Sequence, residues 1–187
     1  ASCEAAKAEG VTIAASAIDA VKDADVVITM LPAGKHVLAV WSEIVPAAKA
    51  GALLIDCSTI DVESARKAHA LAAARKLPSI DAPVSGGVGG AQGATLTFMA
   101  GGSVEAFAAA KPVLEAMGKR IVHCGDAGAG QAAKICNNMI LGISMIGVSE
   151  AFALAEKLGL SHQALFDVAS TSSGQCWSIT SYCPVPG

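Results

Sequence analysis

A lysine and an asparagine one helical turn apart are the side chains best suited to carry proton transfer in this sequence. Lys134 is the only charged residue between Gln131 and Asn138. Residues at i and i+4 of a helix project from one face, so Lys134 and Asn138 are expected to face the same ligand. Near a helix N-terminus, in apolar surroundings, an ammonium is disfavoured and exchanges its proton more readily at neutral pH. The alternative is a solvated lysine beside an asparagine that forms an interhelical hydrogen bond.

A serine and two glycines follow the end of an expected strand. The segment 81–90 reads DAPVSGGVGG, in which Ser85 offers a hydroxyl and Gly86 and Gly87 offer bare backbone N–H groups. Such a concavity could hold a carboxylate, and ligands of open α/β sheets bind beyond the carboxyl ends of strands. The alternative is a loop that needs glycine only for its backbone angles.

A third pattern imitates a dinucleotide fingerprint. Residues 128–133 read GAGQAA, which matches G-x-G-x-x-G/A between a strand and a helix. The following helix is too long for a βαβ unit, and a second helix follows instead of a return strand. We therefore interpret these glycines as a turn, and we expect the phosphate loop of any dinucleotide site to lie upstream of Ala1.

Alternating strands and helices must position these groups. Continuous apolar runs predict strands, the first of them buried on both faces, and alanine-rich stretches predict helices between them. Strands are expected at 25–31, 51–56, 78–82, 95–100 and 120–124, and helices at 35–49, 61–76 and 103–117. This order predicts an α/β fold, a Rossmann-like doubly wound sheet that lacks its first strands.

After residue 129 the spacing of apolar residues along the sequence is typical of helices only. A helix is expected from Gln131 to Leu158, closed by Gly159, and Ser161 opens another. Residues 1–129 are thus part of a sheet domain, and 130–187 are a long interdomain helix with the beginning of an all-helical domain. The apolar stretch 139–148 is expected to be a buried helix.

Composition excludes several classes of function. A net charge of −3 leaves no basic field for nucleic acid, and no apolar run reaches the roughly 18 residues of a membrane span. The six cysteines lack CxxC spacing, which favours reduced thiols, and the four histidines are scattered, so no metal site is expected.

Taken together, these motifs resemble the β-hydroxyacid dehydrogenase family, and in particular its branch that acts on 3-hydroxyisobutyrate. The segment DAPVSGG resembles the family's substrate motif, and its glycine, lysine and asparagine pattern matches Gly125, Gly128, Gly130, Lys134 and Asn138. Segments 134–139, 144–147 and 172–187 resemble the hydroxyisobutyrate branch. The similarity covers essentially the whole chain.

The resemblance implies NAD-dependent oxidation of 3-hydroxyisobutyrate to methylmalonate semialdehyde, a step of valine breakdown. It implies a homo-oligomer in the cytoplasm if bacterial, or in the mitochondrial matrix if eukaryotic. The implied roles are general acid/base for Lys134, substrate binding for Ser85, Gly86, Gly87 and Asn138, and cofactor binding for Leu31, Pro32 and Thr59.

The sequence also departs from the family pattern. His36 stands where an asparagine is common, Gly93 precedes Ala94 where the family places Thr or Asn, and most of the helical domain would follow Gly187. Two alternatives stay open: a tartronate semialdehyde or related short semialdehyde reductase of the same family, and a non-catalytic carboxylate-binding fragment.

Overall fold

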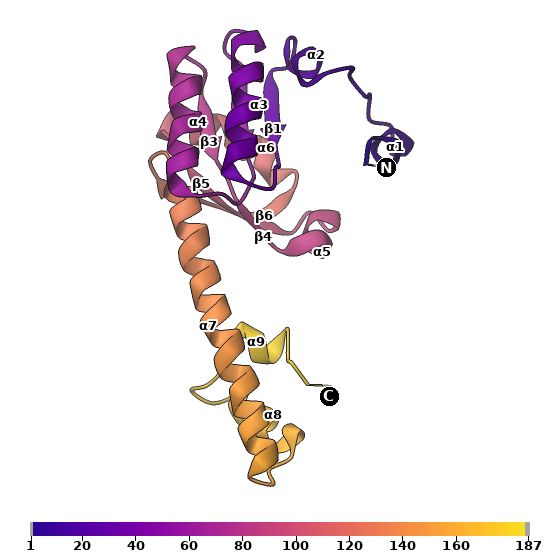
Figure 1. Cartoon of the computed structure of the whole chain (residues 1–187), viewed down its shortest axis with the longest axis vertical. Helices are drawn as coiled ribbons and strands as arrows, with labels where there is room; N and C mark the ends of the chain where they lie inside the picture. The colour runs from indigo at the N-terminus through magenta and orange to yellow at the C-terminus, as the bar shows by residue number, and fades with distance from the viewer. Residues whose placement is uncertain (1, 186–187) are drawn as a thin grey trace. The chain divides into compact units, whose positions relative to one another are not determined.

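The computed structural model describes residues 2–185 and divides into two compact units, Ala1–Lys134 and Ile135–Gly187 (Figure 1). The first unit contains α1 (Ser2–Ala8), α2 (Ala17–Val21), β1 (Val26–Thr29), α3 (Gly34–Ala47), β2 (Leu53–Asp56), α4 (Val62–Ala74), β3 (Ser79–Asp81), β4 (Val84–Ser85), α5 (Gly87–Gln92), β5 (Leu96–Gly101), α6 (Val104–Glu115) and β6 (Gly118–Gly125). Helix α7 (Ala129–Lys157) continues into the second unit, where α8 (His162–Ala169) and α9 (Trp177–Thr180) follow it.

The six strands form one sheet in the order β1-β2-β3-β5-β4, with β6 paired to β5. Strands β1, β2 and β3 are parallel, as the alternating strands and helices predicted. Strand β5 is antiparallel to β3 and β4, whereas β6 is parallel to β5. The connection from β4 to β5 contains only the short helix α5, and a parallel crossover needs a dozen or more residues. This explains why the sheet is mixed beyond β3.

Helices cover both faces of the sheet (Figure 1). On one face α3 and α4 enclose a core that contains Leu54 and the fully buried Trp41. On the other face α6 packs over Ile55 and Phe98. Strand β2 is therefore buried on both faces, but the same expectation for β1 was wrong, since Ile28 is 44% exposed. Strand β1 is an edge strand, and no helix within residues 2–185 covers Ile28.

The helix signals in the sequence are mostly confirmed. Asp61 caps α4 by accepting a hydrogen bond from the Ser64 amide, Ser161 caps α8, and Gly159 after α7 has a φ of 77°. The segment 81–90 was expected to be a concavity that binds a carboxylate or a plain loop, and a helix was not expected, but residues 87–92 form α5. Three of the six residues, Gly87, Gly89 and Gly90, are glycines of low helix propensity, so the local sequence gave no helix signal there.

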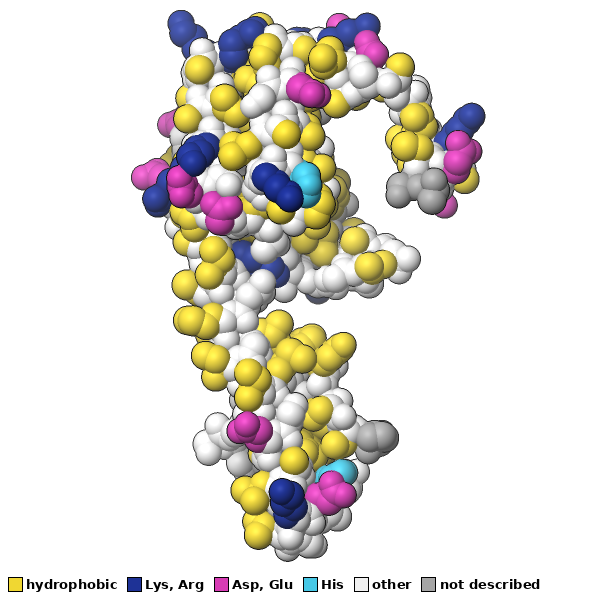
Figure 2. Space-filling model, viewed as in Figure 1, with side chains coloured by type: hydrophobic (Ala, Val, Ile, Leu, Met, Phe, Trp, Pro, Cys, Tyr) yellow, Lys and Arg dark blue, Asp and Glu magenta, His cyan; other side chains and the backbone are white. Residues whose placement is uncertain are grey.

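The second unit has a small core beside an exposed apolar surface. Val148 and Phe152 of α7 pack against Ile179. The expectation of a buried helix at 139–148 was wrong for most of its length, because Met139, Ile140, Ile143 and Ile146 are 60–65% exposed. Hydrophobic side chains are visible on the surface of this helix (Figure 2). Among the described residues, the segment 161–185 covers only the later turns of the helix. By length and composition α7 could cross a membrane, a test that core helices of other proteins also pass.

The first turn of α7 lies so close to the sheet that only glycine fits at Gly130. A Cβ there would stand 2.2 Å from the Met99 carbonyl oxygen and 2.7 Å from that of Asp81. We expect Gly130→Ala to lower the free energy of unfolding by at least about 2 kcal/mol, measured by urea unfolding. Gly142→Ala is the matched control in the same helix, where a Cβ meets nothing within 4 Å. It should stabilise by up to about 1 kcal/mol, and equal effects of the two substitutions would contradict the packing argument.

Candidate functional site

A buried carboxylate joins the ends of β1 and β2. Asp56 Oδ1 accepts hydrogen bonds from the hydroxyls of Thr29 at 2.8 Å and Ser58 at 2.6 Å, and Trp41 Nε1 donates to Thr29 Oγ1. The Leu31 amide in turn donates to Ser58 Oγ at 2.8 Å. The two segments expected to approach a cofactor are thus tied together at adjacent strand ends.

Asp56 is held in surroundings that disfavour its charge. The residue is 2% exposed, and its Oδ2 atom has no hydrogen-bond partner within the described part of the chain. Burial raises the pKa of Asp56, against the lowering effect of its bonds from Ser58 and Thr29, and the nearby charge of Asp81 adds to the rise.

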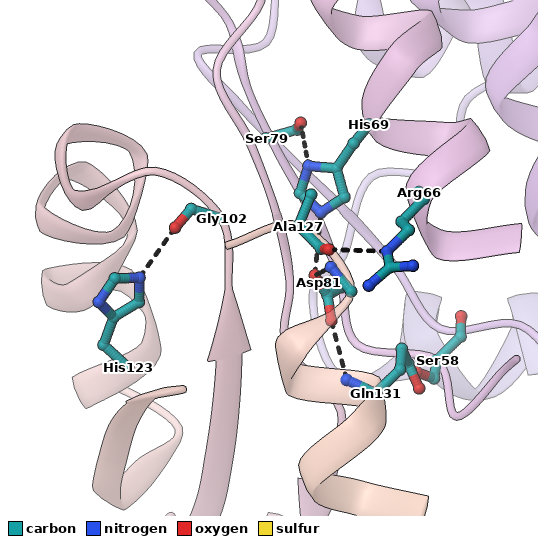
Figure 3. Close-up of polar contacts among 10 residues, drawn as sticks. Ser58, Arg66, His69, Ser79, Asp81, Gly102, His123, Ala127 and Gln131 are labelled. Carbon is teal, nitrogen blue, oxygen red and sulfur yellow. Dashed lines mark hydrogen bonds and ion pairs between the residues drawn. The ribbon is translucent and has the colours of Figure 1, made fainter. Parts of the chain in front are cut away.

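A second buried carboxylate, Asp81, receives the first turn of α7 (Figure 3). Its Oδ1 accepts from the Gly128 amide at 2.8 Å, and its Oδ2 accepts from the Gln131 amide at 2.9 Å. Nε2 of His69 lies 2.9 Å from Asp81 Oδ1, and the other ring nitrogen lies 2.8 Å from Ser79 Oγ. A neutral imidazole satisfies both contacts if Nε2 carries the proton and Nδ1 accepts from the Ser79 hydroxyl.

This contact supports the interpretation of the glycine pattern at 128–133 as a turn. In a dinucleotide fingerprint, the amides that open the helix bind a pyrophosphate. Here two of those amides, of Gly128 and Gln131, bind the Asp81 carboxylate. A Cβ at Gly101 would also stand 2.7 Å from the Gly130 nitrogen, so the glycines serve close packing of α7 on the sheet.

The side chain of Gln131 binds the loop after β2. Its Oε1 accepts from the Ile60 amide at 3.0 Å, and its Nε2 donates to the Ser58 carbonyl at 2.7 Å. Ser58 and Ile60 are buried, whereas Thr59 between them is exposed. The predicted cofactor residue Thr59 therefore stands on a loop whose backbone is fixed on both sides.

Lys134 lies on α7 one turn after Gln131 and is half-buried in the first unit. Burial lowers its pKa. This is the direction that a proton-transfer lysine requires. Asn138 lies on the same helix, as expected, but belongs to the second unit, where it is exposed and its Oδ1 is 3.4 Å from Asn137 Nδ2.

The segment predicted to bind substrate lies at the junction of β4 and α5. Ser85 is half-buried and pairs in register with Thr97 of β5. Gly86 and Gly87 are exposed and have φ values of 134° and 60°, which a residue with a Cβ would adopt only with strain. Of residues 2–185, no three His, Cys, Asp or Glu side chains are grouped so that they could hold a metal ion.

Sequence reasoning did not single out Asp56, Asp81 or Gln131 as parts of the site. One signal was present: Asp56 and Asp81 each end an apolar strand, at register positions that pair with each other. An acidic residue at the end of a buried strand needs a donor nearby. Gln131 gave no comparable signal, because its partners are backbone groups 71 and 73 residues away in the sequence.

Two family models match the chain. Residues 1–125 match the NAD binding domain of 6-phosphogluconate dehydrogenase, and residues 128–186 match the model described as NAD-binding of NADP-dependent 3-hydroxyisobutyrate dehydrogenase. Together the two models cover nearly all of the sequence.

Individual proteins agree with the family models. A probable 3-hydroxyisobutyrate dehydrogenase of Mycobacterium tuberculosis is 54% identical over 182 residues, 97% of this chain and 62% of that protein. An NAD-dependent L-serine dehydrogenase of Pseudomonas aeruginosa is 49% identical over 183 residues, 96% of this chain and 61% of that protein. The chain thus spans about three fifths of the length of these relatives.

A solved structure confirms the Rossmann-like fold. Mycobacterium tuberculosis 3-hydroxyisobutyrate dehydrogenase with L-serine superposes with a TM-score of 0.96 at 54% identity. The match covers 98% of this chain and 63% of that one.

The raised pKa of Asp56 gives a pH-dependent test of the buried network. The native state holds the proton more tightly, so this residue favours folding most below its ordinary pKa of 3.8, and the contribution is lost as pH rises through the raised native pKa. Asparagine does not ionise. Raising the pH from 4 to 8 should therefore increase the melting temperature of Asp56→Asn relative to that of the unsubstituted protein. In free energy of unfolding, the relative gain is roughly 1.4 kcal/mol for each pH unit by which the native pKa of Asp56 is raised.

Thermal unfolding across that range measures the effect. The control is Asp23→Asn, which alters an exposed aspartate and should change the melting temperature little at any pH. If the difference in melting temperature between Asp56→Asn and the unsubstituted protein stays constant with pH, the ionisation of Asp56 does not affect stability.

Proposed function

Because the chain belongs to the β-hydroxyacid dehydrogenase family, we propose that the protein oxidises 3-hydroxyisobutyrate to methylmalonate semialdehyde, with NAD as the hydride acceptor. The observation that carries this proposal is the half-buried Lys134, whose pKa is lowered by burial, on the first turns of a helix fixed against the strand ends. A lowered pKa is the direction that an acid/base lysine requires.

The residues at the strand ends fit a dinucleotide. Leu31 and Pro32 follow β1 and Thr59 follows β2, and these strands are parallel neighbours. Dinucleotides bind outside the carboxyl ends of such strands. We assign cofactor contact to these three residues, with the exposed Thr59 hydroxyl and the exposed Pro32 ring as the most accessible groups. Bound NAD would accept the hydride from the alcohol carbon.

Lys134 carries the proton in this proposal. As the neutral amine it takes the hydroxyl proton while the carbon is oxidised, and in the reverse direction its ammonium polarises the carbonyl. The Ser85 hydroxyl and the amides of Gly86 and Gly87 bind the substrate carboxylate, and Asn138, one turn further along α7, orients the substrate.

We also propose that the whole protein divides after residue 129, where strands give way to α7. It works as a homo-oligomer, in the cytoplasm of a bacterium or in a mitochondrial matrix according to its source. The exposed apolar side chains of α7 support further covering in the complete protein.

L-Serine is a second candidate substrate. It shares with 3-hydroxyisobutyrate the carboxylate and the hydroxymethyl group, and differs in having an ammonium in place of a methyl group at C2. The observation that favours it is the relative named as an L-serine dehydrogenase, which is 49% identical. Tartronate semialdehyde, reduced in the reverse direction, has the same three-carbon acid skeleton and stays the third.

Replacing Lys134 tests the proton-transfer role. In the complete protein, Lys134→Met should lower kcat by about 10²- to 10⁴-fold, the usual contribution of general acid–base catalysis, while NAD affinity measured by calorimetry is unchanged. The pH profile of oxidation by the unsubstituted protein should rise to a plateau with a midpoint below the pKa of free lysine, because burial lowers the pKa of Lys134. Full activity of Lys134→Met in a folded protein would refute the role, and binding of the acid without any turnover would favour the non-catalytic alternative.

Comparing substrates tests the rest of the proposal. We expect kcat/KM for 3-hydroxyisobutyrate to exceed that for L-serine by at least tenfold. This factor corresponds to a preference of about 1.4 kcal/mol for a methyl over an ammonium group in the transition state. Steady-state assays with each acid, and with tartronate semialdehyde plus NADH in reverse, measure the ratios. A higher kcat/KM for L-serine or for tartronate semialdehyde would transfer the assignment to that compound.

A further inference from the structure

The backbone amide of Gln131 and both polar atoms of its side chain make hydrogen bonds. The residue is fully buried, and both atoms of its side-chain amide are used, Oε1 by the Ile60 amide and Nε2 by the Ser58 carbonyl. These partners flank Thr59, the residue assigned to the cofactor. The side chain therefore fixes the backbone of the loop 58–60 at the residues before and after Thr59.

The backbone of Gln131 is fixed as firmly as its side chain. Its amide donates to Asp81 Oδ2 at 2.9 Å, and Asp81 also binds Gly128 three residues earlier and His69 of α4 (Figure 3). A Cβ at Gly130 would collide with two carbonyl oxygens of the sheet, so this turn of α7 has no room to slide. Gln131 thus joins a fixed helix turn to the loop that bears Thr59.

Lys134 follows Gln131 by three residues on the same uninterrupted helix, with Ala132 and Ala133 between them. Residues three apart are neighbours on a helix surface, and no glycine or proline loosens the intervening turn. A displacement of Gln131 would therefore displace Lys134 as well. Catalytic rates are sensitive to such movement, since a misplacement of about 1 Å can cost a factor of 10².

We propose that Gln131 is a positioning residue that sets the location of Lys134 relative to the cofactor loop 58–60. The inference rests on the proposed function, because it assigns the proton transfer to Lys134 and a cofactor contact to Thr59. Gln131 touches neither substrate nor cofactor in this scheme. It acts through the two backbone groups that it binds and through the helix turn that it shares with Lys134.

A double-mutant cycle in the complete protein tests the proposal. Gln131→Met keeps the length of the side chain but removes both hydrogen bonds, and it should lower kcat at saturating NAD about tenfold and raise the KM for NAD several-fold. In the Lys134→Met background the same substitution should leave kcat unchanged while the KM for NAD still rises, because the effect on kcat passes through Lys134.

A control separates positioning from stability. Ser103→Ala removes the cap of α6, where Ser103 Oγ accepts from the Ala106 amide, and should lower the melting temperature without changing kcat or the KM for NAD. If Gln131→Met fails to fold, Gln131→Glu replaces it. The carboxylate still accepts from Ile60 but loses the donation to Ser58 and buries a charge, so kcat should fall and the KM for NAD should rise relative to the unsubstituted protein.

Four outcomes would overturn the inference. Gln131→Met could lower the melting temperature alone, with kcat and the KM for NAD unchanged, which would make the residue merely structural. Equal losses of kcat in both backgrounds would show that it acts independently of Lys134. Full activity of Lys134→Met would remove the proposed function and the inference together, whereas a loss with Lys134→Met and none with Gln131→Met would remove the inference alone.

Discussion

The contact between the Asp81 carboxylate and the first turn of α7 is the constraint on which the rest of the site depends. A helix N-terminus presents unpaired amides and a partial positive charge. A carboxylate accepts hydrogen bonds from those amides and offsets that charge. Asp81 ends β3 and accepts from the amides of Gly128 and Gln131 and from His69 of α4. One side chain thus fixes a strand, a covering helix and the helix that bears Lys134. Without it, three donors would be left unpaired in a buried place, at a cost of about 1–3 kcal/mol each.

The neighbouring carboxylate, Asp56, does similar work with a different set of partners. It pairs in register with Asp81 but is surrounded by the hydroxyls of Thr29 and Ser58 instead of a helix terminus. Hydroxyl donors tie β1 to β2, and one carboxylate oxygen is left without a partner among the described residues. The two aspartates therefore organise adjacent strand ends, one toward the expected cofactor and one toward the expected proton-transfer group.

The sequence predicted most of the fold because the signals were local. Apolar runs marked the parallel strands, Asp61 and Ser161 marked helix starts, and Gly159 marked a helix end. The antiparallel turn into β5, the helix in the glycine segment and the exposed face of Ile28 were not predicted, since each depends on which elements become neighbours. The same reason hid Gln131, whose partners lie some seventy residues away. The positions of Lys134 and Thr59 were predicted, but not the contacts that hold them.

The site also shows why a fingerprint match can mislead. Spacing of glycines fixes only how closely a helix start approaches a sheet, and both a phosphate loop and a packed turn require that approach. The deciding residue lies outside the motif, in the Asp81 that ends a strand 47 residues before Gly128. Because this carboxylate faces the positive end of α7, the helix terminus is already offset. Burial lowers the pKa of Lys134.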